Sequence, residues 1–268
     1  MQGPTQDAAF TPRRGQHESS FSSVLSATYD PAMVPRSGLR LAGCAPLGGV
    51  LFTALVTAGP TREHLDDVRF LANGSSGRMG YAVAEALSAA GCRVHLVSGP
   101  VDILPPHGVE LHPVISALEM QAEVEKLFPG CDLVFAVAAG ADYRPRTRQH
   151  GKPPKSQGGF SIELVPNPDI VAALGRKKVN KVLVGFALES GSFEAARARG
   201  HAKLVAKGLD MIVVNLASTL GAPDVEAWVL TADGREKPLP RAAKSVLAVE
   251  LVREALALVR SRREGIVP

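Results

Sequence analysis

The pattern of apolar and polar positions becomes regular at about residue 49 and predicts alternating strands and helices. Six apolar runs are typical of buried strands: 49–59, 92–100, 109–115, 131–141, 181–189 and 210–216. Apolar residues at helical spacing predict five helices: 78–91, 116–128, 167–178, 192–208 and 242–261. Because the strands are apolar on both faces, we predict an α/β fold, a Rossmann-like, mostly parallel sheet with helices on both faces.

Short-range signals place several ends of these elements. Ser116 followed by Glu119 forms a capping box at the start of the second helix. Asn167, ahead of Pro168, is expected to cap the third helix. An Asp-Gly turn within 226–240 predicts a C-terminal β-hairpin, so the last part of the sheet is expected to be antiparallel.

Two stretches lack a periodic pattern. Residues 1–48 are largely polar and are predicted to be a disordered tail, which leaves a single domain over 49–268. The apolar stretch from Leu41 to Ala58 is broken by Pro and Gly, so we expect no spanning helix and no membrane association. Residues 142–160 mix Pro, Gly and basic side chains and predict a long loop, of the kind that is usually functional or mobile.

The composition limits the ligands and the compartment. A net charge of +4 and a pI near 9.1 suit an anionic ligand, but the charge is too small and too scattered to predict nucleic-acid binding. Three cysteines without a C-x-x-C spacing indicate a reduced, cytoplasmic compartment. Cys92 and Cys131 each start an apolar run and are expected to be buried thiols rather than nucleophiles. The seven His residues show no zinc-ligand spacing, so we assign no metal ligand.

The sheet type indicates where a ligand binds, since parallel sheets bind ligands beyond the carboxyl ends of their strands. Four stretches meet this condition: 57–80, 138–144, the residues after Phe186, and those from Asn215 onward.

The first of these stretches contains LANGSSGRMG, residues 71–80, with Gly at every third position. Neither the dinucleotide fingerprint nor the P-loop fits this spacing. The loop enters a helix, whose first N–H groups attract anions, and Ser75 and Ser76 can cap that helix or donate to an oxyanion. Asn73 offers an amide donor and acceptor at the same place. The alternative is that the glycines only allow close packing, and the spacing alone favours neither.

Several motifs in order resemble one enzyme family. The stretch VTAGPTREHLDDVRFLANGSSGRMG closely resembles the opening of phosphopantothenate–cysteine ligases, the synthetase half of the bifunctional bacterial coenzyme A flavoprotein. The resemblance continues through AAGADYRP, NPDI, VGFALE and AKLVAKGLDMIVVN. It covers roughly Val50 to Asn215, and several separated motifs in the right order make it specific.

The resemblance implies a reaction and its partners. In this family the carboxylate of 4′-phosphopantothenate attacks the α-phosphate of a nucleoside triphosphate, CTP with Mg²⁺ in most bacterial members. Pyrophosphate leaves, and the amine of L-cysteine then attacks the acyl carbon and releases CMP. The resemblance also implies a homodimer. The leading 48 residues are too few for a flavin-binding domain, so we expect no flavin and a separate decarboxylase.

The resemblance also implies roles for matching residues. Asn73 matches the Asn that holds the acyl intermediate, and Lys152 matches a lysine that closes over the phosphates, with Lys155 as a rival in the same loop. Arg69 matches an Arg that reaches the substrate phosphate of the neighbouring subunit; the alternative is a salt bridge with a nearby Asp. The implied substrate positions are Arg69, Ala138, Ala139 and Asp142. The implied nucleotide positions are Ala136, Val137, Ala138, Asp142, Lys152, Pro168, Asp169, Ile170, Val171, Phe186, Lys203 and Lys207.

Two other classes of protein compete with this interpretation. An NAD(P)-dependent reductase requires an acidic residue or Arg at the end of the second strand, where this chain has VSGP. A non-catalytic nucleotide-binding relative is expected to lack Asn73 or the lysines, and all are present. The chain departs from the family after the sixth strand, where it has TLGAPDVEAWVL in place of a Gly-Phe stretch followed by acidic and Asn residues. That departure leaves the choice between CTP and ATP open.

Overall fold

The computed structural model describes residues 52–154, 158–219 and 221–265. These residues lie in one compact unit, Leu41–Pro268. The tail that the sequence predicts over 1–48 falls outside the described residues, as does Lys155.

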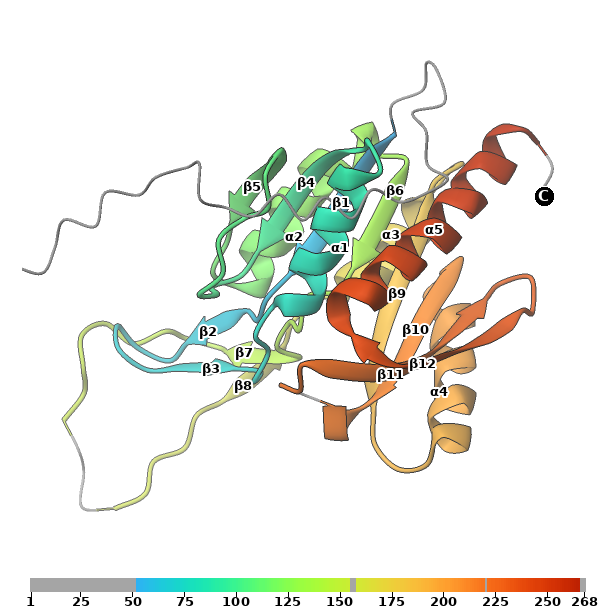
Figure 1. The fold of residues 1–268 in the computed structure, drawn as a ribbon. Coiled ribbons are helices and arrows are strands. Elements are labelled where there is room, and N and C mark those ends of the chain that lie inside the picture. The colour runs from blue at the N-terminus through green and yellow to red at the C-terminus, as the bar shows by residue number, and fades with distance from the viewer. Residues whose placement is uncertain (1–51, 155–157, 220, 266–268) are drawn as a thin grey trace, which may run out of the picture. The chain divides into compact units, whose positions relative to one another are not determined.

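An eight-stranded sheet forms the centre of the described residues (Figure 1). Its spatial order is β5 (Val109–Pro113), β4 (Arg93–Ser98), β1 (Thr53–Ala58), β6 (Leu133–Ala136), β9 (Val182–Glu189), β10 (Met211–Leu216), β11 (Asp224–Thr231) and β12 (Glu236–Ala243). The pairs from β5 to β10 are parallel, and β11 and β12 are antiparallel. The predicted parallel sheet and C-terminal hairpin are therefore confirmed.

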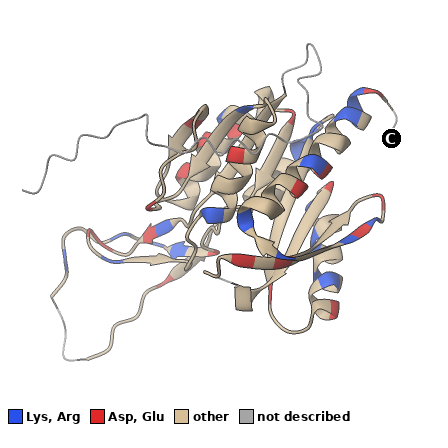
Figure 2. Ribbon diagram, viewed as in Figure 1, with Lys and Arg blue, Asp and Glu red and all other residues tan. Residues whose placement is uncertain are grey.

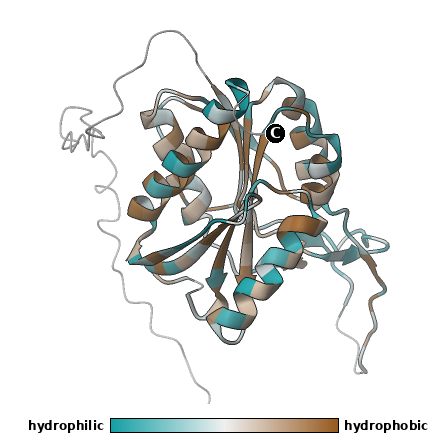
Figure 3. Ribbon diagram, turned by 90° about the vertical axis from the view of Figure 1, so that its right-hand side faces the viewer, coloured by the Kyte–Doolittle hydropathy of each residue, from teal (hydrophilic) through white to brown (hydrophobic). Residues whose placement is uncertain are grey.

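Helices cover both faces of this sheet (Figure 3). On one face, Val56 of β1 belongs to the same core as Leu87 and Leu251, from α1 (Arg78–Ala89) and α5 (Lys244–Arg263). On the other face, Leu55 packs in a second core with residues of α2 (Ala117–Leu127), α3 (Ile170–Lys177) and α4 (Phe193–Ala206). Successive strand residues point to opposite faces, so a strand apolar at every position fills both cores.

The predicted capping box starts α2. The Ser116 hydroxyl accepts a hydrogen bond from the Glu119 N–H at 3.2 Å. The Glu119 carboxylate in turn accepts from the N–H of Ile115 at 2.9 Å. The first bond satisfies one of the backbone donors that a helix start leaves unpaired, and the second ties the residue before the N-cap to the first turn of the helix.

Two small antiparallel sheets lie where only loops are expected. One joins β2 (Arg62–His64) to β3 (Phe70–Ala72), and the other joins β7 (Tyr143–Pro145) to β8 (Leu164–Pro166). Strands of three residues are too short to show a period in the sequence. With their connections, residues 62–72, 143–154 and 158–166 project from the central sheet, and we call them the arm (Figure 1).

The structure also tests the predictions for the two cysteines and for a membrane-spanning helix. Cys92 and Cys131 are buried, and burial raises the pKa of each thiol to about 11. Both are therefore poor nucleophiles, as expected. Among the helices of the described residues, none combines the length and the apolar character that crossing a bilayer requires.

Candidate active site

A cavity of about 550 Å³ is lined by Ala136 at the end of β6 and by residues of β9, β10 and β11. It lies next to the point where the strand order reverses, between β1 and β6, because the chain runs from β1 outward through β4 and β5 and then returns to β6 on the other side. Such reversals are the usual ligand sites of parallel sheets. All four predicted stretches reach this cavity, through Asn73–Gly80, the loop after Ala136, Phe186 and Asn215.

Packing explains two glycines of the loop that enters α1. Gly77 has a φ of 74°, which favours glycine. A Cβ on Gly80 would lie 2.6 Å from the Cβ of Ala58, so α1 can approach β1 this closely only with glycine there. The same loop lines the cavity. The glycines therefore allow α1 to pack closely on β1, and the same loop is also in a position to contact a ligand.

The start of α1 has no side-chain cap. The helix begins at Arg78 with Gly77 at the N-cap, and its first turn holds no acidic residue. The Ser75 hydroxyl accepts only from the Gly77 N–H, at 3.3 Å. A cap by Ser75 or Ser76 is therefore a wrong expectation, because a residue without a side chain occupies the N-cap. The positive end of α1 consequently remains free to attract an anion in the cavity.

Two cations that the sequence analysis missed line the same cavity, Arg78 and Lys244. Within the described part of the chain neither has a hydrogen-bond or ion-pair partner for its charged group. Burial, followed by the nearby charge of Arg78, lowers the pKa of Lys244. The two residues start helices far apart in the sequence, so only the fold brings them together. An anionic ligand would relieve the repulsion between them.

Asn73 lies at the junction of two loops that line the cavity. Its Nδ2 donates to the carbonyl of Gly140 at 2.8 Å and to that of Ala139 at 3.3 Å. Both amide hydrogens are thus used within the chain, and Oδ1 is left to accept from a ligand. The residues predicted around it line the cavity as well: Ala136, Val137, Ala138, Ala139, Asp142 and Phe186.

A second cavity, of about 210 Å³, adjoins the first. It is lined by the predicted nucleotide positions Pro168, Asp169, Ile170 and Val171. Residues shared by the two cavities include Ala138, Asp142, Val171 and Lys207. An elongated ligand can therefore occupy both.

The cap of α3 differs from the prediction. The helix begins at Ile170, and Asp169 caps it by accepting from the N–H of Ala172 at 3.0 Å. Asn167 instead donates to the carbonyl of Ala141 at 2.8 Å and accepts from Arg144 at 3.2 Å. Asn167 thereby ties the start of α3 to the loop that follows β6.

Lys207 reaches the second cavity from the end of α4. Its Nζ lies 3.0 Å from Oδ2 of Asp169. Burial raises the pKa of Asp169, but the N–H of Ala172 and the Lys207 ammonium outweigh it, so the pKa lies below its ordinary value. Asp169 is therefore ionised and holds Lys207 at the cavity.

Three predicted residues do not line either cavity: Lys203, Arg69 and Lys152. Lys203 pairs with Glu189 at 2.6 Å, although it stands four residues before Lys207. Lys207 pairs with Asp169 instead and lines both cavities, so the two lysines do not point to the same place. The role of Lys203 in binding the triphosphate remains a prediction.

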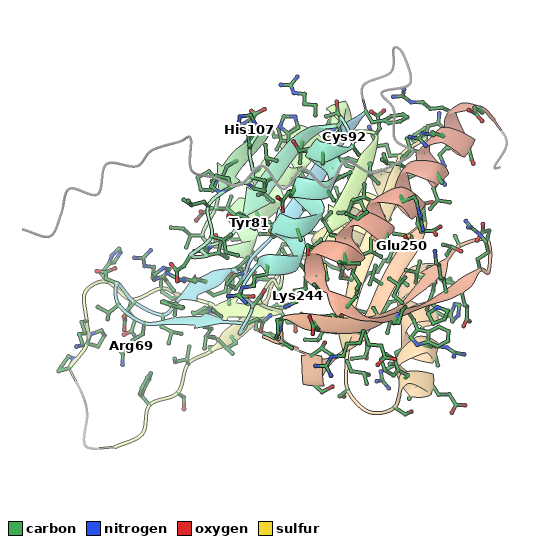
Figure 4. The ribbon with its side chains drawn as sticks, in the orientation of Figure 1. Arg69, Tyr81, Cys92, His107, Lys244 and Glu250 are labelled. Atoms are coloured by element: carbon green, nitrogen blue, oxygen red, sulfur yellow. The ribbon has the colours of Figure 1, made fainter. Side chains whose placement is uncertain are left out.

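Arg69 and Lys152 both lie on the arm. The guanidinium of Arg69 binds the Asp66 carboxylate at 2.6 Å, the salt bridge considered as the alternative for this residue. Lys152 follows Gly151, whose N–H donates to Asp67 at 2.7 Å, so its loop is attached to the β2–β3 turn. Figure 4 shows Arg69 far out on the arm, away from Lys244. Neither residue lines the larger cavity of its own chain in this arrangement.

Comparisons with known proteins agree with the motifs. The sequence model of one protein family, the DNA/pantothenate metabolism flavoprotein C-terminal domain, matches residues 52–258. The coenzyme A biosynthesis bifunctional protein CoaBC of Bacillus subtilis (strain 168) is 40% identical over 225 residues, which are 82% of this chain and 54% of that protein. CoaBC of Vibrio cholerae serotype O1 is 46% identical over 170 residues, 62% of this chain and 42% of that protein.

The same comparisons extend to a solved structure. The crystal structure of the C-terminal domain of CoaBC matches with a TM-score of 0.67 and 34% identity, over 78% of this chain and 96% of that one. The chain spans about half the length of the curated relatives that it matches, and the matched solved domain lies at their C-terminal end.

Proposed function

We propose that this chain is a phosphopantothenate–cysteine ligase of coenzyme A biosynthesis. It belongs to the family of the DNA/pantothenate metabolism flavoprotein C-terminal domain. Its substrates are 4′-phosphopantothenate, L-cysteine and magnesium-bound CTP, and its products are 4′-phosphopantothenoylcysteine, CMP and pyrophosphate. No flavin takes part, and the following decarboxylation is the task of a different catalytic domain.

The observation that carries this proposal is the unpaired positive charge of the larger cavity. Arg78, Lys244 and the uncapped start of α1 face a volume of about 550 Å³, within the usual range for small-molecule sites. Unpaired cations next to helix N–H groups favour a ligand with several negative charges, as phosphopantothenate and a nucleoside triphosphate have.

The first step forms the acyl-nucleotide. A carboxylate oxygen of phosphopantothenate attacks the α-phosphorus of CTP, the bond to the bridging oxygen breaks, and its electron pair leaves with pyrophosphate. Negative charge therefore grows on the leaving group, where Lys207 and the unpaired cations line the cavity and Lys152 closes over it. Asp142 borders both cavities, a position suited to the Mg²⁺ that accompanies CTP.

The second step forms the amide. The cysteine nitrogen attacks the acyl carbon, the carbon–oxygen bond to the phosphate breaks, and CMP leaves. Asn73 suits this step because its Oδ1 can accept a hydrogen bond from the attacking amine while Nδ2 stays bound to the Gly140 carbonyl. The small side chains of Ala138 and Ala139 let the intermediate approach the backbone of the loop.

The second cavity receives the nucleotide base. The main chain from Pro168 to Val171 lines it and offers hydrogen-bonding groups to a base edge. Phe186 borders the larger cavity and packs on the nucleotide. Hydrogen bonds from the α3 start, rather than the phosphate contacts, are expected to decide between CTP and ATP.

The active unit is a homodimer that is joined through the arm. The arm exposes a set of large apolar side chains whose exposed fractions run from 39% to 66%: Val68, Phe70, Tyr143, Phe160, Ile162 and Leu164. A set of this size on one projecting element is typical of an interaction surface. A second copy on this surface brings Arg69 to the substrate phosphate in the partner's cavity.

Pyrophosphate release tests the proposed function. We expect release that requires phosphopantothenate, is faster with CTP than with ATP, and yields the amide only when L-cysteine is added. Absence of pyrophosphate release with both nucleotides, from protein that is folded and dimeric, would overturn the assignment.

A further inference from the structure

A compact group of titratable side chains lies on the sheet, apart from the residues that line the two cavities. His95 belongs to β4, and Glu110 and His112 belong to the neighbouring edge strand β5 (Figure 1). In the parallel register, His95 is directly paired with Glu110, and His112 is paired with Val97, two residues further along β4. Because residues two apart on a strand share a face, the three side chains point to the same side of the sheet.

The distances between their polar atoms match those of a metal-ligand set. His95 Nδ1 lies 3.2 Å from His112 Nε2 and 3.2 Å from Oε2 of Glu110, and His112 Nε2 lies 3.5 Å from Oε1 of Glu110. Zn²⁺ is bound at about 2.0–2.1 Å by imidazole nitrogen, so two ligands of a tetrahedral site lie about 3.3 Å apart. The cluster therefore presents two imidazole nitrogens at this spacing and a carboxylate that has one oxygen close to each of them.

The surroundings orient these donors. His112 Nδ1 lies 2.9 Å from Oε1 of Glu123 on α2, so this carboxylate accepts the Nδ1 proton and leaves the Nε2 lone pair toward the cluster. Glu123 is held in turn by Lys126 at 3.1 Å. A carboxylate behind a ligating imidazole is the usual second layer of a zinc site.

Burial and access also suit a metal ion. His95 is 8% exposed, so its imidazole lies largely out of contact with water. The Glu110 side chain is 52% exposed, which leaves a path from solvent. The nearest competing cation is Arg93, whose nitrogen lies 3.6 Å from Oε2 of Glu110, beyond a normal hydrogen bond.

We propose that His95, Glu110 and His112 form a binding site for a transition-metal dication, best suited to Zn²⁺, that fastens the edge strand β5 to β4 and to α2. Two imidazoles and one carboxylate select zinc over magnesium, which prefers oxygen ligands and keeps its waters. Water completes the coordination on the exposed side. The sequence analysis assigns no metal ligand because the two histidines are 17 residues apart and only strand pairing joins them.

Metal titration of the full chain tests the site. The chelator-stripped protein, without an affinity tag, is titrated at pH 7.5 with Zn²⁺ against a chromophoric chelator. We compare it with His112→Gln and Glu110→Gln, and with His107→Gln as a matched control from the loop before β5. We expect the wild type to bind one Zn²⁺ more than either site variant, and at least ~100-fold weaker binding at this site in both variants. His107→Gln is expected to keep the wild-type affinity.

Two further measurements separate a metal site from a hydrogen-bonded cluster. Glu123→Gln, which removes only the second layer, should weaken zinc binding by about 10–100-fold without abolishing it. Zn²⁺ at about 100 times its Kd should raise the Tm of the wild type by roughly 5–10 °C and leave that of His112→Gln in place. Millimolar Mg²⁺ should not displace the zinc. The proposal is wrong if the wild type and both site variants, all folded, bind Zn²⁺ with equal stoichiometry and affinity.

Discussion

Single residues of the larger cavity differ in how far their charges are already satisfied. Lys207 is held by Asp169, whereas Arg78 and Lys244 have no such partner among the residues described. A charge that is already paired gains less from a bound phosphate than one that is not. The unpaired residues should therefore contribute most to binding the anionic substrates.

Lys244 allows a test of this difference. Because the ammonium of Lys244 has no anionic partner among the described residues, Lys244→Ala should raise the KM for the nucleotide or for phosphopantothenate about 10-fold or more. Lys244→Arg should recover part of the loss. In the wild type, affinity for the anionic ligand should fall as the pH rises through the Lys244 pKa, because the ammonium loses its charge. Steady-state kinetics across the alkaline range measures both effects, and Lys126→Ala, on α2 outside the cavities, serves as the control. Equal losses in the two Ala variants would contradict the assignment.

Asn73 and Lys152 should act in different steps of the proposed reaction. Lys152 is cationic, so Lys152→Ala should slow the release of pyrophosphate about 10²–10³-fold. Asn73 is neutral and serves amide formation, so Asn73→Asp should release pyrophosphate and accumulate acyl-cytidylate. A single-turnover assay with labelled CTP distinguishes these outcomes. The double variant with Lys155→Ala shows whether the rival lysine substitutes. If both single variants lose pyrophosphate release equally, the division of roles is wrong.

At the scale of elements, the site depends on how closely α1 lies on β1. Gly80 permits that approach, and its own loop lines the cavity. Packing and binding are therefore linked through one helix start.

Gly80→Ala should disturb both properties. The added Cβ would lie 2.6 Å from the Cβ of Ala58, and relieving this clash should cost about 1–3 kcal/mol of unfolding free energy. The shift of α1 should also raise the KM for the anionic substrates. Gly130→Ala is a matched control, since a Cβ there meets no atom within 4 Å. Urea unfolding and kinetics provide the two readouts. Unchanged stability in Gly80→Ala would show that α1 shifts freely.

The turn between β2 and β3 depends on Asp66. Its buried carboxylate accepts from the N–H groups of Val68 and Arg69, at 2.8 and 2.7 Å, and from the Arg69 side chain. The Arg69 N–H, with the other donors, outweighs burial and lowers the pKa of Asp66 from 3.8 to about 2. A carboxyl with a lowered pKa stabilises the folded turn above its unfolded pKa, and this stabilisation is lost as the pH falls through the folded value.

The turn should therefore lose its order in a defined acidic window. The amide resonances of Val68 and Arg69 should titrate with a midpoint near pH 2 and stay constant above about pH 4. Asp66→Asn should remove the titration, whereas Asp102→Asn, in the loop after β4, should leave it unchanged. A midpoint at the ordinary Asp value would show that these hydrogen bonds do not form in solution.

At the scale of the whole molecule, charge and apolar surface are distributed differently. Figure 2 shows acidic and basic residues interspersed along α5 rather than gathered by sign. The exposed apolar side chains, in contrast, include a group on the arm, which also carries Arg69 and Lys152. The arm is therefore the part of the molecule where assembly and catalysis are expected to meet.

A mixed-subunit experiment tests the shared site. Arg69→Ala and Asn73→Ala should each be inactive alone, because every cavity then lacks one residue. In a hybrid dimer, one cavity receives Arg69 from the Asn73→Ala subunit and keeps its own Asn73, so partial activity should return. Phe160→Asp, on the apolar surface of the arm, should shift the chain toward monomers in sedimentation. An inactive hybrid, with heterodimers confirmed, would argue that each chain uses its own Arg69.

Much of the fold and the family follow from the sequence alone. The parallel sheet, its covering helices and the final hairpin were predictable because apolar runs and helical spacing are local properties of the chain. The four stretches around the larger cavity were predictable because strand ends in a parallel sheet share one edge. The motifs added roles for Asn73, Lys152 and their neighbours, which remain predictions.

Tertiary structure decided what depends on residues that are distant in the sequence. Arg78 and Lys244 meet only because α1 and α5 cover the same face of the sheet and start at the same cavity. The strands of the arm have three residues each, and they form only by pairing with one another. His95 and His112 become neighbours through the register of β4 and β5. A pattern along one chain shows which face is buried, but it does not specify which polar groups two packed elements bring within hydrogen-bond distance.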